Sequence, residues 1–342
     1  MTGKKVIVTG SKGFIMGYVI EELLKRGYFV VGIDNLSKYG EIEKSYDSNP
    51  NYKFIEGDAK DIGLLKENLK DAEHFISSAA MIGGIPYFHK FAYDLLAENE
   101  RLTAAAFDAA IWAHKNSKLK KITALASSMI YESANKWPSV EGDEFIIPPP
   151  LSTYGFQKLA VVYYCKGAWE QHKLPYTIIS PFNAIGIGEM KAKTGNEILS
   201  GNVSLAMSHV IPDLVQKILK GQNPLHILGS GDQIRHYTYS GDLARGIADS
   251  LENEDAINQS FNLSTEEGHT VKDLAQIIWK KVNGDDKLTF ISDDPYVYDV
   301  QKRIPSTEKA KKILGFEAKT NLDEALDEII PWIKEMIESD RI

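Results

Sequence analysis

The sequence has almost none of the residues that cross-link a fold or hold a structural metal. It contains a single cysteine, Cys165, so an internal disulfide is excluded, and such low cysteine usage is typical of a reducing compartment. The eight histidines are scattered, and none stands at a ligand spacing beside cysteines or paired acids. We therefore expect no metal site.

Long apolar runs and excess positive charge are also missing. No apolar run reaches the roughly 20 residues of a membrane span, and the N-terminal residues enter a strand without the layout of a signal peptide. The net charge of −8 argues against a nucleic-acid or anionic-membrane partner, because both require a dense positive patch. We expect a cytoplasmic protein in which a few local cations bind any phosphate group.

Short runs rich in β-branched residues alternate with helical stretches through the first half of the chain. These runs cover residues 6–10, 28–34, 52–58, 74–80, 120–128 and 176–182. Helical crossovers between successive strands produce a parallel sheet with helices on both faces. The pattern predicts an α/β fold in which residues 1–182 form a doubly wound parallel sheet of the Rossmann type.

The alternation changes after Phe182. A glycine-rich loop comes next, and the remaining chain has helical stretches at 208–221, 241–253, 270–282 and 321–339 and short strands at 226–229 and 261–264. We interpret residues 183–342 as a smaller α/β lobe that binds the substrate. Parts of 225–265 are expected to return to the first domain.

The stretch VIVTGSKGFIMGYVIEEL, residues 6–23, runs from a buried strand through two glycines into an amphipathic helix. Gly10 and Gly13 stand where backbone N–H groups and a helix N-terminus can meet a pyrophosphate. The third glycine of a dinucleotide fingerprint is replaced by Met16, and Gly17 follows one residue late. Because that glycine mainly lets helix and strand pack closely, we expect Met16 to alter packing more than phosphate contact.

Two acidic residues strengthen the interpretation of this turn as a dinucleotide site. Asp34 ends the second strand, about 20 residues after the turn, where a carboxylate binds the adenosine ribose hydroxyls and repels a 2′-phosphate. Asp58 ends the third strand, near the expected edge of the adenine. We therefore predict NAD, rather than NADP, as the cofactor.

A serine strand and a tyrosine–lysine helix carry the predicted chemistry. Ser127 ends a buried strand, and Tyr154 and Lys158 stand four residues apart on a helix, so they share a face. A tyrosine is a poor base at neutral pH, but a neighbouring ammonium group and a positive nicotinamide ring both favour its phenolate. We expect Ser127 to hold a reacting hydroxyl while Tyr154 takes its proton; by itself, the tyrosine–lysine pair would suggest only two neighbouring surface side chains.

Further motifs are spread over nearly the whole chain. They include VTGSKGFI, GIDNLS, EGDAKD, SSMIYE, TYGFQK, SPFNAIGIGE, SHVIPDL, ILGSGDQIRHYTYSGDLA and STEKAKKILGF. Together they resemble the extended short-chain dehydrogenase/reductases that act on nucleotide sugars, the epimerase/dehydratase group. The resemblance implies an NAD-binding Rossmann domain and a nucleotide-diphosphate sugar as substrate.

The resemblance also implies roles for individual residues. The catalytic residues would be Ser127, Tyr154 and Lys158, with His209 as a further candidate. The cofactor would contact Gly10, Gly13, Phe14, Ile15, Asp34, Asn35, Asp58, Ala59, Ala79, Ala80, Asn99, Tyr154, Lys158 and Pro181. The substrate would contact Ser128, Met129, Asn183, Arg235 and Arg303. Arginine suits a diphosphate because its planar fork binds two phosphate oxygens at once.

Two departures from the group bear on the reaction. Sugar-nucleotide 4,6-dehydratases typically carry Asp-Glu after the catalytic serine, but here Ser128 and Met129 follow, and a thioether does not transfer protons at useful rates. GDP-mannose 3,5-epimerases and GDP-fucose synthases carry a cysteine at the position of Met129, so that acid is missing too. His209 matches the segment that holds a catalytic histidine in the fucose synthases; it is either an acid or base, or a cap of the following helix.

These residues favour a redox-neutral epimerase. We expect oxidation of the sugar at C4 to a transient 4-ketose, followed by its reduction from the opposite face, which gives the C4 epimer and needs no further acid or base. If His209, Lys191 or Lys193 lies beside C3 or C5, epimerisation there is the alternative. A 4,6-dehydratase, a keto-sugar reductase and a non-catalytic NAD sensor are further alternatives. The resemblance also implies a homodimer formed through the helices that hold Asn99 and Tyr154. The nucleotide base is left open.

Overall fold

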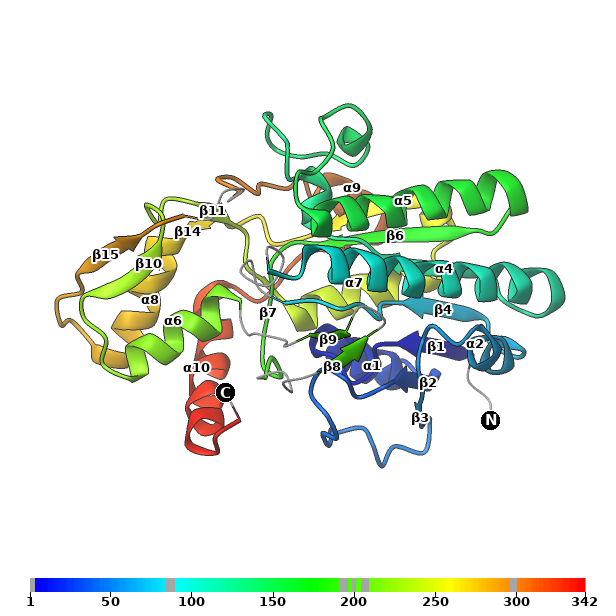
Figure 1. Cartoon of the computed structure of the whole chain (residues 1–342), viewed down its shortest axis with the longest axis horizontal. Helices are drawn as coiled ribbons and strands as arrows, with labels where there is room; N and C mark the ends of the chain where they lie inside the picture. The colour runs from blue at the N-terminus through cyan, green and yellow to red at the C-terminus, as the bar shows by residue number, and fades with distance from the viewer. Residues whose placement is uncertain are drawn as a thin grey trace.

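A parallel sheet of seven strands forms the centre of the protein, in the order β13-β6-β5-β4-β1-β2-β3 (Figure 1). The computed structural model describes residues 4–83, 90–190, 196–198, 201–203, 209–295 and 300–341. The strands of the sheet are β1 (Lys5–Thr9), β2 (Phe29–Asp34), β3 (Tyr52–Glu56), β4 (His74–Ser77), β5 (Lys121–Leu125), β6 (Tyr176–Pro181) and β13 (Gln259–Leu263). Every pairing between them is parallel, which confirms the predicted fold class.

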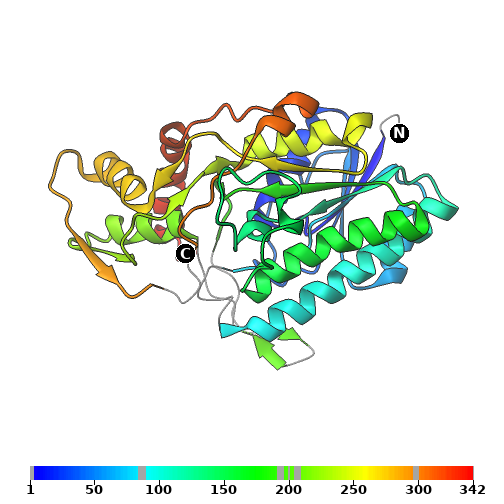
Figure 2. The same ribbon diagram turned by 90° about the horizontal axis from the view of Figure 1, so that it is seen from above.

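Helices cover both faces of this sheet and bury two apolar layers (Figure 2). One face is covered by α1 (Phe14–Lys25), α7 (Ser240–Glu252) and α9 (Glu308–Leu314). The other is covered by α2 (Ile62–Leu69), α4 (Ala92–Asn116) and α5 (Thr153–His172). Val6, Ile7 and Val8 of β1 are fully buried between the layers, as expected for a continuous apolar run in a parallel sheet. The sequence pattern thus fixes both faces of the central strands as core.

A smaller lobe lies beyond the carboxyl ends of the strands, at the left of Figure 1. It consists of α6 (Val210–Leu219), α8 (Val271–Asn283), α10 (Leu322–Glu338) and the parallel pair β10 (Leu225–Leu228) and β15 (Phe290–Asp293). Its own core contains Leu214, Leu274 and Ile329. The starts of α8 and α10 are fixed by capping boxes, which satisfy backbone N–H groups that a helix end leaves unpaired.

Short ladders and turns connect the sheet and the lobe. β7 (Ala184–Ile185) pairs with β12 (Thr238–Tyr239), and β11 (Ile234–Arg235) pairs with β14 (His269–Thr270). The remaining elements are the hairpin of β8 (Asn196–Ile198) and β9 (Gly201–Val203) and the 3₁₀ turns η1 (Ser128–Tyr131), η2 (Asp143–Phe145) and η3 (Glu254–Ala256).

The predicted strand at 261–264 corresponds to β13, which pairs with β6 as the seventh strand of the sheet and lies in the segment 225–265 that was expected to return to the first domain. β15 pairs with β10 but was not expected, because its side chains are only partly buried and show no alternating pattern. Among the described helices, none is long and apolar enough to cross a membrane.

Candidate active site

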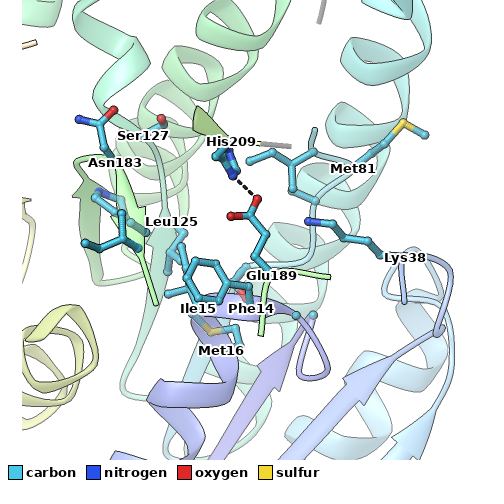
Figure 3. A pocket seen from close by; sticks show the side chains of 18 of the residues that line it. Phe14, Ile15, Met16, Lys38, Met81, Leu125, Ser127, Asn183, Glu189 and His209 are labelled. Carbon is cyan, nitrogen blue, oxygen red and sulfur yellow. Dashed lines mark hydrogen bonds and ion pairs between the residues drawn. The ribbon is translucent and has the colours of Figure 1, made fainter. Parts of the chain in front are cut away.

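A cavity of about 670 Å³ lies at the carboxyl ends of the strands, between the sheet and the lobe (Figure 3). Its walls come from the β1–α1 turn, the ends of β2 and β5, the start of α5, and α6 and β11 of the lobe. The predicted site residues that line it are Gly10, Gly13, Phe14, Ile15, Asp34, Asn35, Asp58, Ala59, Ala79, Ala80, Ser127, Ser128, Met129, Tyr154, Lys158, Pro181, Asn183, His209, Arg235 and Arg303. Residues from distant parts of the sequence therefore share one cavity.

Asn99 is the predicted site residue that this cavity does not include. Its side-chain amide is buried in α4, donates to the carbonyl of Met81 at 2.9 Å and accepts from the Met81 N–H at 2.6 Å. Asn99 instead lines a small neighbouring cavity together with Lys158. Its structural role is to hold the segment after β4, and cofactor contact by Asn99 stays a prediction.

The β1–α1 turn has the shape of a phosphate cradle. Gly10 has a φ of +72°, and a side chain there would bring its Cβ within 3.0 Å of the Ala79 Cα. A Cβ at Gly13 would lie 2.9 Å from the Gly10 carbonyl oxygen. Gly13 is the N-cap of α1 and provides no side-chain cap, so bare backbone meets the cavity at the positive end of the helix dipole. The turn fits the pyrophosphate of a dinucleotide.

Met16 replaces the third glycine without filling this turn. The residue is buried, belongs to the apolar layer between α1 and the sheet, and forms part of the cavity wall. A Cβ at Gly17 would meet the tip of Lys44 at 3.4 Å, an ordinary contact. The substitution therefore changes a packing position and leaves the two glycines of the cradle in place.

Asp34 is held at the end of β2 by the glycine turn itself. One carboxylate oxygen accepts the backbone N–H of Lys12 at 3.0 Å, and the other accepts that of Leu36 at 2.8 Å. Burial raises the pKa of Asp34, against the opposing effect of these hydrogen bonds and the charges of Lys12 and Lys44. The carboxylate is thus fixed at the rim where the ribose was expected.

The cavity wall around Asp58 carries a residue that the sequence analysis missed. Asp58 accepts the backbone N–H of Lys60 at 2.9 Å, and the Lys60 ammonium lies 3.5 Å from the same carboxylate. Lys60 also forms an ion pair with buried Glu98 of α4, and both line the cavity. The only signal for Lys60 in the sequence was its place two residues after Asp58.

Ser127, Tyr154 and Lys158 lie together in the middle of the cavity wall. Ser127 ends the segment after β5, where its hydroxyl accepts the backbone N–H of Met129 at 3.2 Å and hydrogen-bonds with Tyr154. Tyr154 and Lys158 are both buried on α5, and the Lys158 Nζ lies 5.9 Å from the centroid of the tyrosine ring. The Lys158 ammonium donates to the Leu125 carbonyl at 3.3 Å.

The electrostatics of this group differ from the sequence expectation. Burial raises the pKa of Tyr154, while the Ser127 hydrogen bond and the charge of Arg303 oppose the rise. Burial lowers the pKa of Lys158 to about 8, although the charge of Glu100 opposes the shift. Lys158 was expected to lower the pKa of Tyr154, but burial of the phenol has the larger effect and raises that pKa. Burial also destabilises the charged form of Lys158 itself.

The three predicted phosphate-binding residues gather on the lobe side. Asn183 donates from its side-chain amide to the His236 carbonyl at 3.2 Å, and Arg303 donates to the Asn183 side-chain oxygen at 3.4 Å. Arg235 is buried on β11 and donates to the Ile234 carbonyl at 2.9 Å. Although the chain is acidic overall, the cavity has the local cations that a diphosphate requires.

His209 has a partner that the sequence analysis did not assign. It stands at the N-cap of α6, the place that the helix-cap alternative gave it, but its side chain makes no capping hydrogen bond. Its Nδ1 is hydrogen-bonded to the buried carboxylate of Glu189 (Figure 3). Ser128 and Met129 are buried in η1 and reach the cavity wall, whereas Lys191 and Lys193 lie outside the described residues.

Comparison with known proteins decides the family. A family model described as the NAD dependent epimerase/dehydratase family matches residues 6–264. The chain belongs to this family. A putative UDP-glucose 4-epimerase of Methanocaldococcus jannaschii is 26% identical, over 96% of this chain and 98% of that protein. The mouse dTDP-D-glucose 4,6-dehydratase is 24% identical, over 97% of this chain and 89% of that protein.

Solved structures share the fold. A UDP-N-acetylglucosamine 4-epimerase from Methanobrevibacter ruminantium, in complex with UDP-N-acetylmuramic acid, has a TM-score of 0.82 and 25% identity, covering 98% of this chain and all (100%) of that chain. The UDP-glucuronic acid 4-epimerase from Bacillus cereus, in complex with UDP-glucuronic acid and NAD, has a TM-score of 0.79 and 23% identity, covering 97% and 99%. The protein is therefore an NAD-dependent enzyme of the nucleotide-sugar epimerase/dehydratase type.

The cavity fits the cofactor of this epimerase/dehydratase family. Gly10 and Gly13 supply the cradle for the pyrophosphate, and Asp34 stands at the expected position of the adenosine ribose. Tyr154 and Lys158 lie further along the same wall, where the nicotinamide would reach the substrate. The expectation of NAD from the sequence is confirmed by the family.

Proposed function

We propose that this enzyme inverts a nucleotide sugar at C4 through a transient 4-keto sugar. The observation that carries the proposal is the group of Ser127, Tyr154 and Lys158 in the cavity that also contains the glycine cradle. Oxidation of an alcohol requires a hydroxyl group that holds the alcohol and a base that takes its proton, both beside a nicotinamide site. A non-catalytic NAD sensor would not need it.

Each residue of the group has a defined task. Tyr154 takes the proton of the sugar 4-hydroxyl, and Ser127 holds that hydroxyl by a hydrogen bond. Lys158 is held beside Tyr154 by the hydrogen bond that its ammonium donates to the Leu125 carbonyl, and it supplies positive charge below pH 8. When bound, NAD would supply the hydride acceptor for C4 oxidation and the donor for reduction from the opposite face, so the cycle would involve no net oxidation. Arg303 and the positive nicotinamide ring favour the phenolate of Tyr154.

The residues beside Ser127 favour epimerisation over dehydration. Loss of water from a 4-keto sugar requires an acid and a base near C5 and C6. Ser128 and Met129 line the cavity next to Ser127, and neither replaces the Asp-Glu pair that dehydratases typically carry. C4 inversion needs only the phenol that Tyr154 supplies.

The substrate that the cavity suits is a nucleotide-diphosphate sugar. Arg235 and Arg303 are placed to bind the diphosphate, with Asn183 held between Arg303 and the His236 carbonyl. Because two of the structural relatives bind UDP-sugars, these are the first substrates to test.

The outer face of α4 and α5 suits a second copy of the chain. Tyr93, Phe156 and Tyr163 expose 68%, 50% and 57% of their surface on these two helices. Large exposed aromatic side chains on neighbouring helices are typical of an interface, so we infer a homodimer through α4 and α5.

We infer a cytoplasmic location from the single buried thiol, Cys165, which is typical of a reducing compartment.

A panel of UDP-, GDP-, CDP- and dTDP-sugars carrying deuterium at C4 tests the activity. We expect one of them to be converted to its C4 epimer with the C4 deuterium retained, as read by NMR. Formation of a 4-keto-6-deoxy sugar would instead identify a dehydratase, and stoichiometric consumption of NADH a reductase. Bound NAD without turnover of any sugar would support a sensor.

Substitution of Tyr154 tests the mechanism. Tyr154→Phe removes the proton acceptor, so turnover should fall by at least about 100-fold while NAD stays bound. Tyr163→Phe on the exposed face of the same helix is the matched control and should retain activity. Substantial turnover by Tyr154→Phe would remove this phenol from the reaction.

A further inference from the structure

Glu189 is a buried carboxylate in the cavity, and the predicted mechanism gives it no task. Only 8% of the residue is exposed, and a carboxylate is costly to bury without a partner. Figure 3 shows its side chain extending to His209, with Lys38 on the other side. Burial raises the pKa of Glu189, but the charge of His209 and hydrogen bonds from its ring and backbone N–H outweigh burial and lower it. The group is therefore an ionised acceptor.

Both partners are attached to ordered parts of the fold. The loop of Glu189 is held to α1, because the Tyr18 hydroxyl accepts the backbone N–H of Ile187 at 2.8 Å. His209 opens α6, whose apolar side packs in the core of the lobe. The ring nitrogen that faces Glu189 is Nδ1, so Nε2 is the ring nitrogen that Glu189 leaves unengaged, on a residue that lines the cavity. The charged or titratable groups that act on Glu189, besides His209, include Lys38 and Tyr39.

We propose that Glu189 is a positioning residue that keeps the proton of His209 on Nδ1, so that Nε2 serves as a second acid and base toward the sugar. The arrangement is the one by which a buried carboxylate fixes the tautomer and orientation of a catalytic imidazole. This inference rests on the proposed 4-keto sugar, because only a carbonyl at C4 makes a neighbouring C–H bond acidic.

The step that follows is proton exchange at C3 or C5. Nε2 takes the proton, the C–H electron pair enters a new C=C bond, and the carbonyl π electrons move to the C4 oxygen as an enolate. Return of a proton from Nε2 reverses each change, so atoms and charge balance without any oxidant. A single base returns the proton to the face from which it came, and Met129 has no proton for the other face. The carbon is therefore exchanged with retention, while C4 is inverted.

Turnover in deuterated water measures this exchange against C4 inversion in one sample. We expect wild-type product to contain solvent deuterium at C3 or C5 in its original configuration. His209→Gln should lower the ratio of exchange to inversion by at least about 100-fold, and Glu189→Gln by about 10-fold. Glu189→Asp, which keeps the carboxylate, should restore part of the ratio. Glu267→Gln removes the carboxylate from another histidine pair, that with His269, and should leave the ratio unchanged.

The position of the imidazole proton is a readout that needs no turnover. Nitrogen-15 NMR of the histidine rings should find the His209 proton on Nδ1 in the wild-type protein and a shifted tautomer balance in Glu189→Gln. An unchanged balance in that variant would overturn the positioning role.

The outcomes separate this inference from the proposed function. C4 inversion without solvent deuterium at C3 or C5 would end the inference and leave the epimerase intact. Failure of every sugar to be inverted would end the proposed function and the exchange step with it, and the NMR result would still decide the role of Glu189. An equal exchange ratio in wild type and His209→Gln would assign the base to another residue.

Discussion

Burial acts on the charge state of the two helix residues that we propose carry the chemistry. Tyr154 and Lys158 lie one turn apart inside the cavity wall, and burial shifts the pKa of each toward its neutral form. The phenolate therefore depends on positive charge brought by Arg303 and by the cofactor ring. Without cofactor and substrate, Tyr154 therefore stays an uncharged phenol and an inactive base, whereas Lys158, with a pKa of about 8, still carries its charge at pH 7.

The buried ammonium of Lys158 lowers the free energy of unfolding, and this loss can be measured. Its pKa falls from 10.5 to about 8 on folding, so below pH 8 the folded protein holds a charge that the unfolded chain solvates better. Lys158→Met should abolish turnover but raise the free energy of unfolding at pH 7 by about 2 to 3 kcal/mol. The gain should shrink as the pH rises from 8 to 10.5, because the folded wild-type lysine then gives up its proton.

Urea unfolding at several pH values checks this prediction. Lys118→Met, at an exposed lysine, should change stability little at any pH. A gain from Lys158→Met that does not vary with pH would show that packing, and not charge, causes it.

Asp34 should control the choice between NAD and NADP. We expect its carboxylate to occupy the place that a 2′-phosphate would need, and Lys12 and Lys44 act on it from nearby. Asp34→Ala should therefore shift the ratio of the two dissociation constants toward NADP by about 10-fold, which is about 1.4 kcal/mol. Calorimetric titration with both dinucleotides measures the shift. Asp58→Ala, on the adenine side, should weaken both to a similar extent, and an unchanged ratio in Asp34→Ala would remove this residue from ribose recognition.

At the scale of elements, the start of α7 holds the segment that leads to α10. Asp242 is fully buried, pairs with Arg245, and accepts the backbone N–H groups of Lys319 at 3.0 Å and Thr320 at 2.9 Å. Asp242→Asn should lower the free energy of unfolding by about 3 kcal/mol, because Arg245 loses its counter-charge and one accepting oxygen is replaced by an NH2 group that cannot accept a hydrogen bond. Chemical denaturation measures this loss.

Asp249 on the same helix provides the matched control. It pairs with Arg26 at 2.7 Å while its side chain is 35% exposed, so Asp249→Asn should cost less than about 1 kcal/mol. Equal losses at both positions would contradict the role assigned to the buried carboxylate.

Elements with a strong local pattern were predictable, and elements fixed by tertiary contact were not. The β1–α1 turn could be identified because Gly10 and Gly13 occupy positions that their backbone requires. β15 escaped prediction because a short, half-exposed strand has no periodic signal and depends on β10 for its partner.

The same distinction applies to the site. The sequence allowed prediction of Ser127, Tyr154 and Lys158, because the end of a strand and one helical turn define their positions. Glu189 was not, because it meets His209 only through the course of a loop after β7. Nothing in the spacing of a glutamate and a histidine 20 residues apart indicates that their side chains touch.

At the scale of the whole molecule, the exposed aromatic face of α4 and α5 should control assembly. Phe156→Asp combined with Tyr163→Asp places two charges on that face and should convert the proposed homodimer to a 38.2 kDa monomer. Light scattering after size exclusion measures the mass. Ile291→Asp, on exposed β15 of the lobe, is the control that should remain dimeric. A wild-type protein that is already monomeric would remove the dimer from the description of this enzyme.

The path of the chain between sheet and lobe limits where segments of two related proteins can be joined to make a chimera. After α6 and β10 the chain returns to the sheet as α7 and β13, enters the lobe again as α8 and β15, and comes back once more as α9 before α10. A single crossover after Phe182 between two relatives would therefore combine β6 from one parent with β13 from the other. New sugar specificities would be transplanted more safely as separate inserts, each cut where the chain crosses from one body to the other.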